Sequence, residues 1–479
     1  AEIVAYDFWT KRLFVVNADA AAVDVLDVSD PTLPVKIGAI DAGGLGGGVN
    51  SVAVRNGLVV IAVEADDKQA DGLVAFYSAW TLNLIVTVPA GALPDMVTFS
   101  PNGRYVLVAN EGEPDDDYAV DPVGSITVID IWRGRVRTAG FEAFNGSADA
   151  LRAGGVRIFG PGASVAQDLE PEFITVDKRS RFAYVTLQEN NAVAKVNIRR
   201  AKVVDVFGLG SKDHSLPGNG LDPSDRDAGI AIDNWPVRGL YMPDAIASYR
   251  YRGKTYLITA NEGDAREYEG DNFEFVEEER IADITLDPAA FPNAAELQDD
   301  AALGRLNITL ADGDPDGDGD YDTLYSFGTR SFSIWNEYGE LVFDSGADLE
   351  HITAELLPDE FNSNNDENDS FESRSDNKGP EPEGVAVGRI KGRTYAFIGL
   401  ERIGGIAVYD VTVPHRARFL SYVNNRDFGG DAEAGTAGDL GPEGIAFIPA
   451  WQSPTYEPLL AVGNEVSGTT TLYRVDVSR

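Results

Sequence analysis

The stretch that decides the fold is LPDMVTFS (93–100), followed by YVLVANEGE (105–113) and SITVIDI (125–131). Each run is short, rich in Val, Ile, Phe and Tyr, and bounded by Gly, Asn, Asp or Pro, which is typical of β-strands joined by turns. A turn with Pro and an acidic residue opens the first run. The second run ends in a polar residue and Glu, and the third alternates and ends near Asp. We therefore predict a repeating unit of antiparallel strands.

The same order of turns and strands returns along the chain. The clearest further copies start with EPEFITVD (170–177), MPDAIASY (242–249), EPEGVAVG (381–388) and GPEGIAFI (441–448). Two weaker copies come first, EIVAYD (2–7) without the Glu of the second run and NSVAVRN (50–56) without the Pro. Repeated units of three or four short strands are typical of a β-propeller, whose radial closure removes long exposed edges. We therefore predict an all-β fold, a β-propeller of about seven blades.

A pair of β-sandwiches and a β-helix are the alternative architectures, but the units are too long and too unevenly spaced for a β-helix. One segment, 287–303, has the composition of a short helix. We expect a single propeller domain over residues 1–479, with insertions that cover one face of the disc, since long loops in compact domains are usually functional. These insertions, rich in Gly, Asp, Asn and Pro, are predicted near 132–169, 207–241, 265–323 and 344–380.

The charge balance argues against several functions. The chain has 479 residues, with 78 Asp and Glu against 39 Lys and Arg, a formal net charge of -39. This excess disfavours binding to nucleic acid or to an anionic membrane, and no apolar run is long enough for membrane insertion. The sequence has no cysteine and only three histidines, which excludes disulfides and thiolate sites and argues against a zinc site. Excess carboxylate instead favours solubility in salt, or the binding of divalent cations.

An acidic loop, ADGDPDGDGDYDTL (311–324), is the first candidate metal site. Six carboxylates alternate with Gly, Pro and Tyr, and they belong to Asp312, Asp314, Asp316, Asp318, Asp320 and Asp322. Calcium takes six to eight oxygen ligands, and so many carboxylates on one tight loop repel each other without a cation. The first half resembles an EF-hand loop, although Thr323 stands where the closing Glu belongs. We expect calcium here; a solvated acidic turn is the alternative.

The repeat itself supplies a second candidate metal site. Equivalent positions of a propeller are related by rotation, so an acid at one strand end of each blade becomes a ring of acids around the central funnel. The first such ring consists of Asp95, Glu172, Asp244, Glu383 and Glu443. The second consists of Glu111, Glu189, Glu262, Glu401 and Glu465, with Glu64 as a further member. We expect one or more calcium ions, and a second divalent metal, in this funnel; turn caps and ion pairs within each blade are the alternative.

Four cationic side chains near these acids are candidates for binding phosphate: Arg266, Arg330, Lys378 and Arg402. Metals and guanidinium groups neutralise a transferring phosphoryl group. The sequence has no GxSxG motif, P-loop or GxGxxG motif in a βαβ context, so a metal-bound water is the expected nucleophile and no catalytic residue is assigned. Ordinary ion pairs in an acidic protein are the alternative role of these four residues.

Four long motifs carry a family resemblance over nearly the whole chain: LPDMVTFSPNGRYVLVANEGEP, MPDAIASYRYRGKTYLITANEGDAREY, DGDPDGDGDYDTLYSFGTRSFSIWN and SDNKGPEPEGVAVG. They resemble the choice-of-anchor I family, also described as mesenchyme-specific cell surface glycoprotein-like. The resemblance implies a secreted protein that is extracellular, periplasmic or attached to the cell surface. Some members are atypical alkaline phosphatases, and the acidic funnel is similar to that of β-propeller phytases by analogy of fold.

Two main functions follow as expectations. The first is a calcium-dependent phosphoesterase whose funnel acids hold the metals and whose substrates are phosphate esters. The second is a non-catalytic surface or adhesion module that calcium stabilises and that meets a protein partner at the cell surface. Binding of a sugar or another small molecule at the mouth of the propeller is a third, which rests only on the aromatic content.

Overall fold

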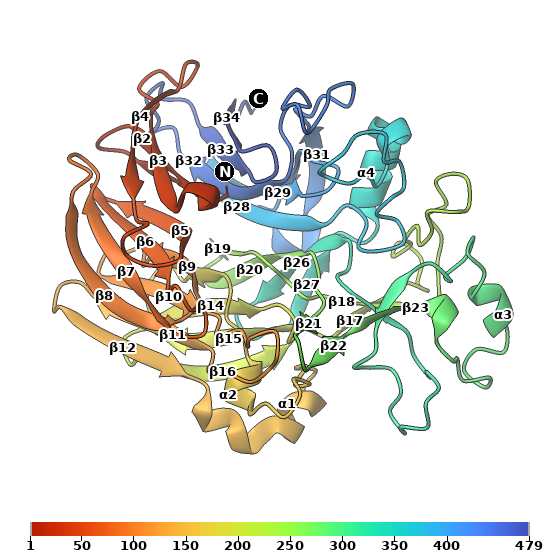
Figure 1. Ribbon diagram of the computed structural model, residues 1–479. Coiled ribbons are helices and arrows are strands. Elements are labelled where there is room, and N and C mark those ends of the chain that lie inside the picture. The colour runs from red at the N-terminus through yellow and green to blue at the C-terminus, as the bar shows by residue number, and fades with distance from the viewer. Residues whose placement is uncertain (1, 478–479) are drawn as a thin grey trace.

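The computed structural model describes residues 2–477, whose main sheets are arranged around a common centre (Figure 1). The first three sheets are β1 (Val4–Asp7), β2 (Arg12–Asn17), β3 (Ala22–Asp27) and β4 (Val35–Asp41); β5 (Gly48–Arg55), β6 (Leu58–Glu64), β7 (Asp71–Ser78) and β8 (Leu84–Ala92); and β9 (Pro94–Phe99), β10 (Tyr105–Asn110), β11 (Ser125–Asp130) and β12 (Arg135–Gly140). The next two are β13 (Ile174–Val176), β14 (Phe182–Leu187), β15 (Ala192–Asn197) and β16 (Lys202–Gly208); and β19 (Ile246–Tyr251), β20 (Lys254–Asn261), β26 (Ser331–Asn336) and β27 (Leu341–Asp344). The last two are β28 (Pro382–Ile390), β29 (Arg393–Leu400), β30 (Ile406–Asp410) and β31 (Arg418–Val423); and the three-stranded β32 (Pro442–Ile448), β33 (Leu459–Asn464) and β34 (Thr469–Arg474).

The innermost strands of these sheets contact one another in a closed ring. Strand β1 packs beside β5, β5 beside β9, β9 beside β13, β13 beside β19, β19 beside β28, β28 beside β32, and β32 again beside β1. The strands within each sheet are antiparallel neighbours. This radial arrangement of small antiparallel sheets confirms the predicted all-β propeller fold.

Burial decreases from the middle of each sheet toward its outer edge. All six residues of β10 and of β11 are buried, whereas most of β12 and most of β8 are exposed or half-buried. The apolar runs that defined the repeat are therefore the strands that the neighbouring sheets cover. Their Val, Ile and Leu side chains form the cores between adjacent sheets.

The insertions between strands contain the remaining elements. Before the fourth sheet lie the 3₁₀ helix η2 (Glu142–Ser147), α1 (Ala148–Ala153) and α2 (Val165–Asp168). Around the fifth lie β17 (Ser211–Asp213), β18 (Arg238–Leu240), β21 (Glu267–Glu269), β22 (Glu274–Val276), β23 (Glu278–Arg280), η3 (Ile281–Asp283), α3 (Ala294–Leu297), β24 (Asn307–Thr309) and β25 (Tyr325–Ser326). After it come α4 (Asp348–Leu356) and η4 (Pro358–Glu360), and the short η1 (Ala18–Ala20) and η5 (Pro414–Arg416) lie in the first and sixth sheets.

One predicted insertion contains a strand of a main sheet, and the expected short helix is present. The predicted insertion 132–169 includes β12, the outermost strand of its sheet, whose exposed side chains hide the alternation of the repeat. The short helix expected within 287–303 is the single turn α3, whose Leu297 packs with Leu221 and Val237 in a separate small core. This core, built from two insertions, lies beside the propeller on the side of β23 and α3 (Figure 1).

No helix within residues 2–477 is long and apolar enough to cross a lipid bilayer.

Candidate functional site

A ring of polar side chains stands at the start of the innermost strands. Each member lies two positions before a paired strand residue, such as Val97 opposite Val108 or Ile445 opposite Val462. The seven equivalent residues are Glu2, Asn50, Asp95, Glu172, Asp244, Glu383 and Glu443. The sequence prediction missed Glu2 and Asn50, although aligning EIVA and NSVA with EGIA of the last copy identifies both.

The second ring lies at the ends of the second strands, beside the first, because antiparallel neighbours bring these ends to one edge of each sheet. Glu64, Glu111, Glu262, Glu401 and Glu465 are equivalent by strand register. In the fourth sheet Gln188 takes this place, and the predicted Glu189 is the next residue along the chain. The Gln188 side-chain amide donates a hydrogen bond to the Glu262 carboxylate across 3.1 Å, which joins two neighbouring blades.

The funnel acids repel one another electrostatically. Burial, and then the Glu2 carboxylate, raise the pKa of Asp95 to about 7. Burial and neighbouring carboxylates also raise the pKa values of Glu172 and Glu443 well above the usual range of a carboxyl group. One side-chain oxygen each of Glu172, Glu189, Glu383 and Glu443 is buried without a hydrogen-bond partner. Such oxygens need a proton or a cation.

Three predicted acids from adjacent blades come together as a possible metal centre. Asp244, Glu262 and Glu383 each offer a carboxylate oxygen, and the three oxygens lie within 4.8 Å of one another. Glu262 also accepts a hydrogen bond from Lys378, whereas the described residues give no ion pair to Asp244 or Glu383. Oxygens this close together can share one cation that binds its ligands about 2.4 Å away, so the group is a candidate calcium site.

Lys378 and Arg402, two of the predicted phosphate ligands, belong to an ion-pair network around the fully buried Glu381. The Glu381 carboxylate lies 3.2 Å from the Lys378 ammonium, 2.7 Å from the Arg374 guanidinium and 3.0 Å from the Arg402 guanidinium. Arg402 also contacts Glu401 at 3.1 Å. A second acidic group, of Glu262, Glu381 and Glu401, is therefore already neutralised by cationic side chains.

Arg266 and Arg330, the other two predicted phosphate ligands, are buried in ion pairs. Arg266 contacts Asp168 at 2.5 Å and Glu170 at 2.7 Å, and it is 3% exposed. Arg330 contacts Glu350 at 2.6 Å and donates further hydrogen bonds to backbone carbonyls. The acidic partners lie in insertions outside the repeat, 98 residues from Arg266 and 20 residues from Arg330, so the repeat does not predict these ion pairs.

A cavity of about 470 Å³ lies beside Glu111 of the second ring. Its lining includes Glu111, Glu189, Arg266, Lys378 and Arg402. Seven carboxylate side chains line it against four cationic ones. A second cavity, of about 420 Å³, follows the innermost strands and reaches Asp95, Asp244 and Glu443. The first cavity thus borders Glu111 of the second ring, and the second cavity borders three acids of the first ring.

Only some of the acids in the predicted calcium loop lie close together. Asp314, Asp316 and Asp322 each place a carboxylate oxygen within 4.8 Å of the other two. Asp312 instead pairs with Arg157 at 2.7 Å, and Asp318 accepts a hydrogen bond from the amide of Asp320. The cation expected from six alternating acids would therefore have three of them as its ligands in this loop.

Comparisons with known proteins agree with the sequence motifs. Gigasin-3a of Magallana gigas is 34% identical over 190 residues, which are 37% of this chain and 66% of that protein. The mesenchyme-specific cell surface glycoprotein of Strongylocentrotus purpuratus is 28% identical over 313 residues, which are 57% of this chain and 40% of that protein. The chain therefore spans less than two thirds of the length of either relative.

The comparison of folds leads to the same architecture. Hydrazine synthase of Kuenenia stuttgartiensis is 13% identical with a TM-score of 0.51, and the match covers 99% of this chain and 95% of that one. At this identity the likeness concerns the fold alone. The model of the choice-of-anchor I domain matches residues 2–414, which hold both acidic rings except Glu443 and Glu465. The chain therefore belongs to the choice-of-anchor I family.

Proposed function

We propose that the chain is an extracellular or cell-surface propeller module that binds a divalent cation, calcium, in its acidic funnel. The observation that carries this proposal is the group of Asp244, Glu262 and Glu383, whose ligand oxygens lie within 4.8 Å of one another. Carboxylate-only groups suit calcium, magnesium and manganese, and calcium accepts the least regular geometry. The surface location is supported by the name of the sea-urchin relative.

The cation would act on the fold by joining blades. Asp244 and Glu262 belong to the fifth sheet and Glu383 to the sixth, so one ion between them links neighbouring blades at the centre of the ring. Neighbouring carboxylates otherwise repel at this point, and a ligand that binds only the folded state stabilises it. Calcium would therefore serve as a structural element of the module.

Calcium titration of chelator-stripped protein by calorimetry tests this proposal. Glu383→Gln keeps the size of the side chain but removes one charge, so we expect the loss of one binding site, or an affinity at least about tenfold weaker. The matched control, Glu274→Gln, changes an exposed Glu and should bind as the wild type does. Unchanged stoichiometry and affinity in Glu383→Gln would contradict the proposal.

A calcium-dependent phosphoesterase is the second candidate, favoured by the open cavity of about 470 Å³ beside the funnel acids. A metal ion there would supply an activated water, and Lys378 and Arg402 would orient a phosphate ester. The preponderance of carboxylates in the lining, and the ion pairs of both cations, weigh against a phosphate dianion. Turnover of p-nitrophenyl phosphate that chelation abolishes and Glu383→Gln reduces would support this candidate; its absence with calcium bound would leave the non-catalytic module.

A further inference from the structure

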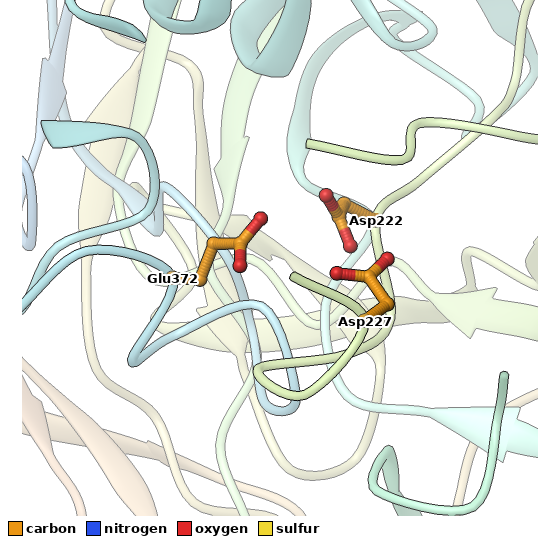
Figure 2. Close-up of side chains that lie close together, drawn as sticks. All are labelled: Asp222, Asp227 and Glu372. Carbon is orange, nitrogen blue, oxygen red and sulfur yellow. The ribbon is translucent and has the colours of Figure 1, made fainter. Parts of the chain in front are cut away.

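A fourth group of acids lies outside the funnel, where two insertions meet. Asp222 and Asp227 belong to the segment between β17 and β18, and Glu372 belongs to the segment between η4 and β28. The three carboxylates point toward one another across a small gap, Glu372 from one chain segment and the two Asp from the other (Figure 2). One oxygen of each lies within 4.8 Å of the other two.

Two of the three acids are buried, and the group is incompletely hydrogen-bonded. Asp222 is 0% and Glu372 is 3% exposed. Oε1 of Glu372 is buried with no hydrogen-bond partner, although this carboxylate faces the other two. The backbone around it is fixed, since the amide of Glu372 donates to the carbonyl of Phe361 across 2.8 Å. A buried carboxylate oxygen that lacks a donor and faces two more carboxylates needs a proton or a cation.

Neighbouring acids show what this group lacks. Asp225 pairs with Arg305 at 2.8 Å, and Glu350 pairs with Arg330 at 2.6 Å. Among the residues that the structure describes, no Lys, Arg or His forms an ion pair with any of the three acids. Burial, and then the negative charges of Asp222, Asp227 and Asp225, raise the pKa of Glu372 to about 8. The arginines of this region thus form their ion pairs with other carboxylates.

We infer that Asp222, Asp227 and Glu372 form a separate cation site, which takes calcium and fastens the two insertions to each other. The three oxygens lie close enough together to share one ion, and an all-oxygen set with up to three negative charges suits a hard divalent cation. Because the acids come from segments about 145 residues apart in the chain, the ion would close a long loop, and the entropic advantage of such closures grows slowly with loop length. This site is independent of the funnel, since it shares no residue with either acidic ring.

Calcium alone, added to chelator-stripped full-length protein, is the probe for this site. We expect Glu372→Gln to lose one calcium site, or to weaken it at least about tenfold, while the funnel site is retained. Calcium should also protect the two insertions from limited proteolysis in the wild type but not in the variant. Glu355→Gln, an exposed Glu in α4, is the matched control and should keep both the binding and the protection.

A second variant distinguishes the loss of a metal ligand from misfolding. Asp227 is only half-buried, so Asp227→Asn removes a ligand charge with less disturbance of the core. If Asp227→Asn and Glu372→Gln both bind calcium with the wild-type stoichiometry and affinity, the site does not exist. Loss of a site in Glu383→Gln but not in these two variants would likewise overturn the inference while it supports the funnel proposal.

Discussion

At the scale of single residues, Glu381 shows how this acidic protein keeps a buried charge. Burial alone would raise its pKa, but the cations of Lys378, Arg374 and Arg402 outweigh this effect and lower the pKa to about 2. The charged form is therefore the stable one in the folded protein. The three cations in turn depend on Glu381, which is the acid they share.

We expect Glu381→Gln to lower the free energy of unfolding by about 3–5 kcal/mol at neutral pH, because three cations lose a buried partner. The folded-state pKa lies below the unfolded value, so the contribution of Glu381 is complete above about pH 4.5 and is lost as the pH falls toward 2. Urea denaturation at several pH values measures the difference between wild type and variant. A difference that stays constant from pH 5 to pH 2 would contradict this explanation, and Glu296→Gln, at an exposed site, is the control.

At the scale of elements, buried arginines join the insertions to one another. Arg266 precedes β21, and its partner Asp168 ends α2, 98 residues earlier in the chain. A second arginine, Arg157, contacts both Glu277 and Asp312. The insertions are therefore connected to one another by charge pairs as well as by the small apolar core.

Replacing Arg266 tests whether this residue serves the structure or a phosphate ligand. Arg266→Leu leaves Asp168 and Glu170 buried without a cation, so we expect a loss of about 3–5 kcal/mol in the free energy of unfolding. Chemical denaturation of the variant and of Arg179→Leu, an exposed control, measures it. Wild-type stability in Arg266→Leu would indicate that the arginine is free for a ligand.

The strands and the insertions differ in how well the sequence predicts them. The strands and the funnel acids repeat locally, so each copy of Pro-acid followed by an apolar run located a strand and a ring residue. The partners of Arg266 and Arg330 come from insertions without any repeat, 98 and 20 residues away, and only the packing of these insertions pairs them. The group of Asp222, Asp227 and Glu372 was missed for the same reason, because its members share no motif.

At the scale of the whole molecule, the ring closes by side-chain packing. Strands β1 and β32 belong to different sheets, and Val4, Leu13 and Val15 pack against Ile448 and Leu459. The last sheet has three strands where the other blades have four. The closure of the ring therefore depends on a small apolar interface.

We expect Leu459→Ala to lower the free energy of unfolding by about 2–5 kcal/mol, since the residue is 4% exposed in this interface. Leu33→Ala, at a side chain that is 69% exposed, should change it by less than about 0.5 kcal/mol. Thermal and urea unfolding of both variants measure the effect. Equal stability of the two would show that the closing interface contributes little.

The packing between the first and last blades also affects how the propeller responds to a pulling force. A force that pulls β1 away from β32 meets apolar contacts and no shared ladder of backbone hydrogen bonds, because the two strands lie in separate sheets. Apolar contacts act over a short range, so this interface would separate before the backbone hydrogen bonds within a sheet break. A propeller under tension would open first between the first and the last sheet, with its individual sheets still intact.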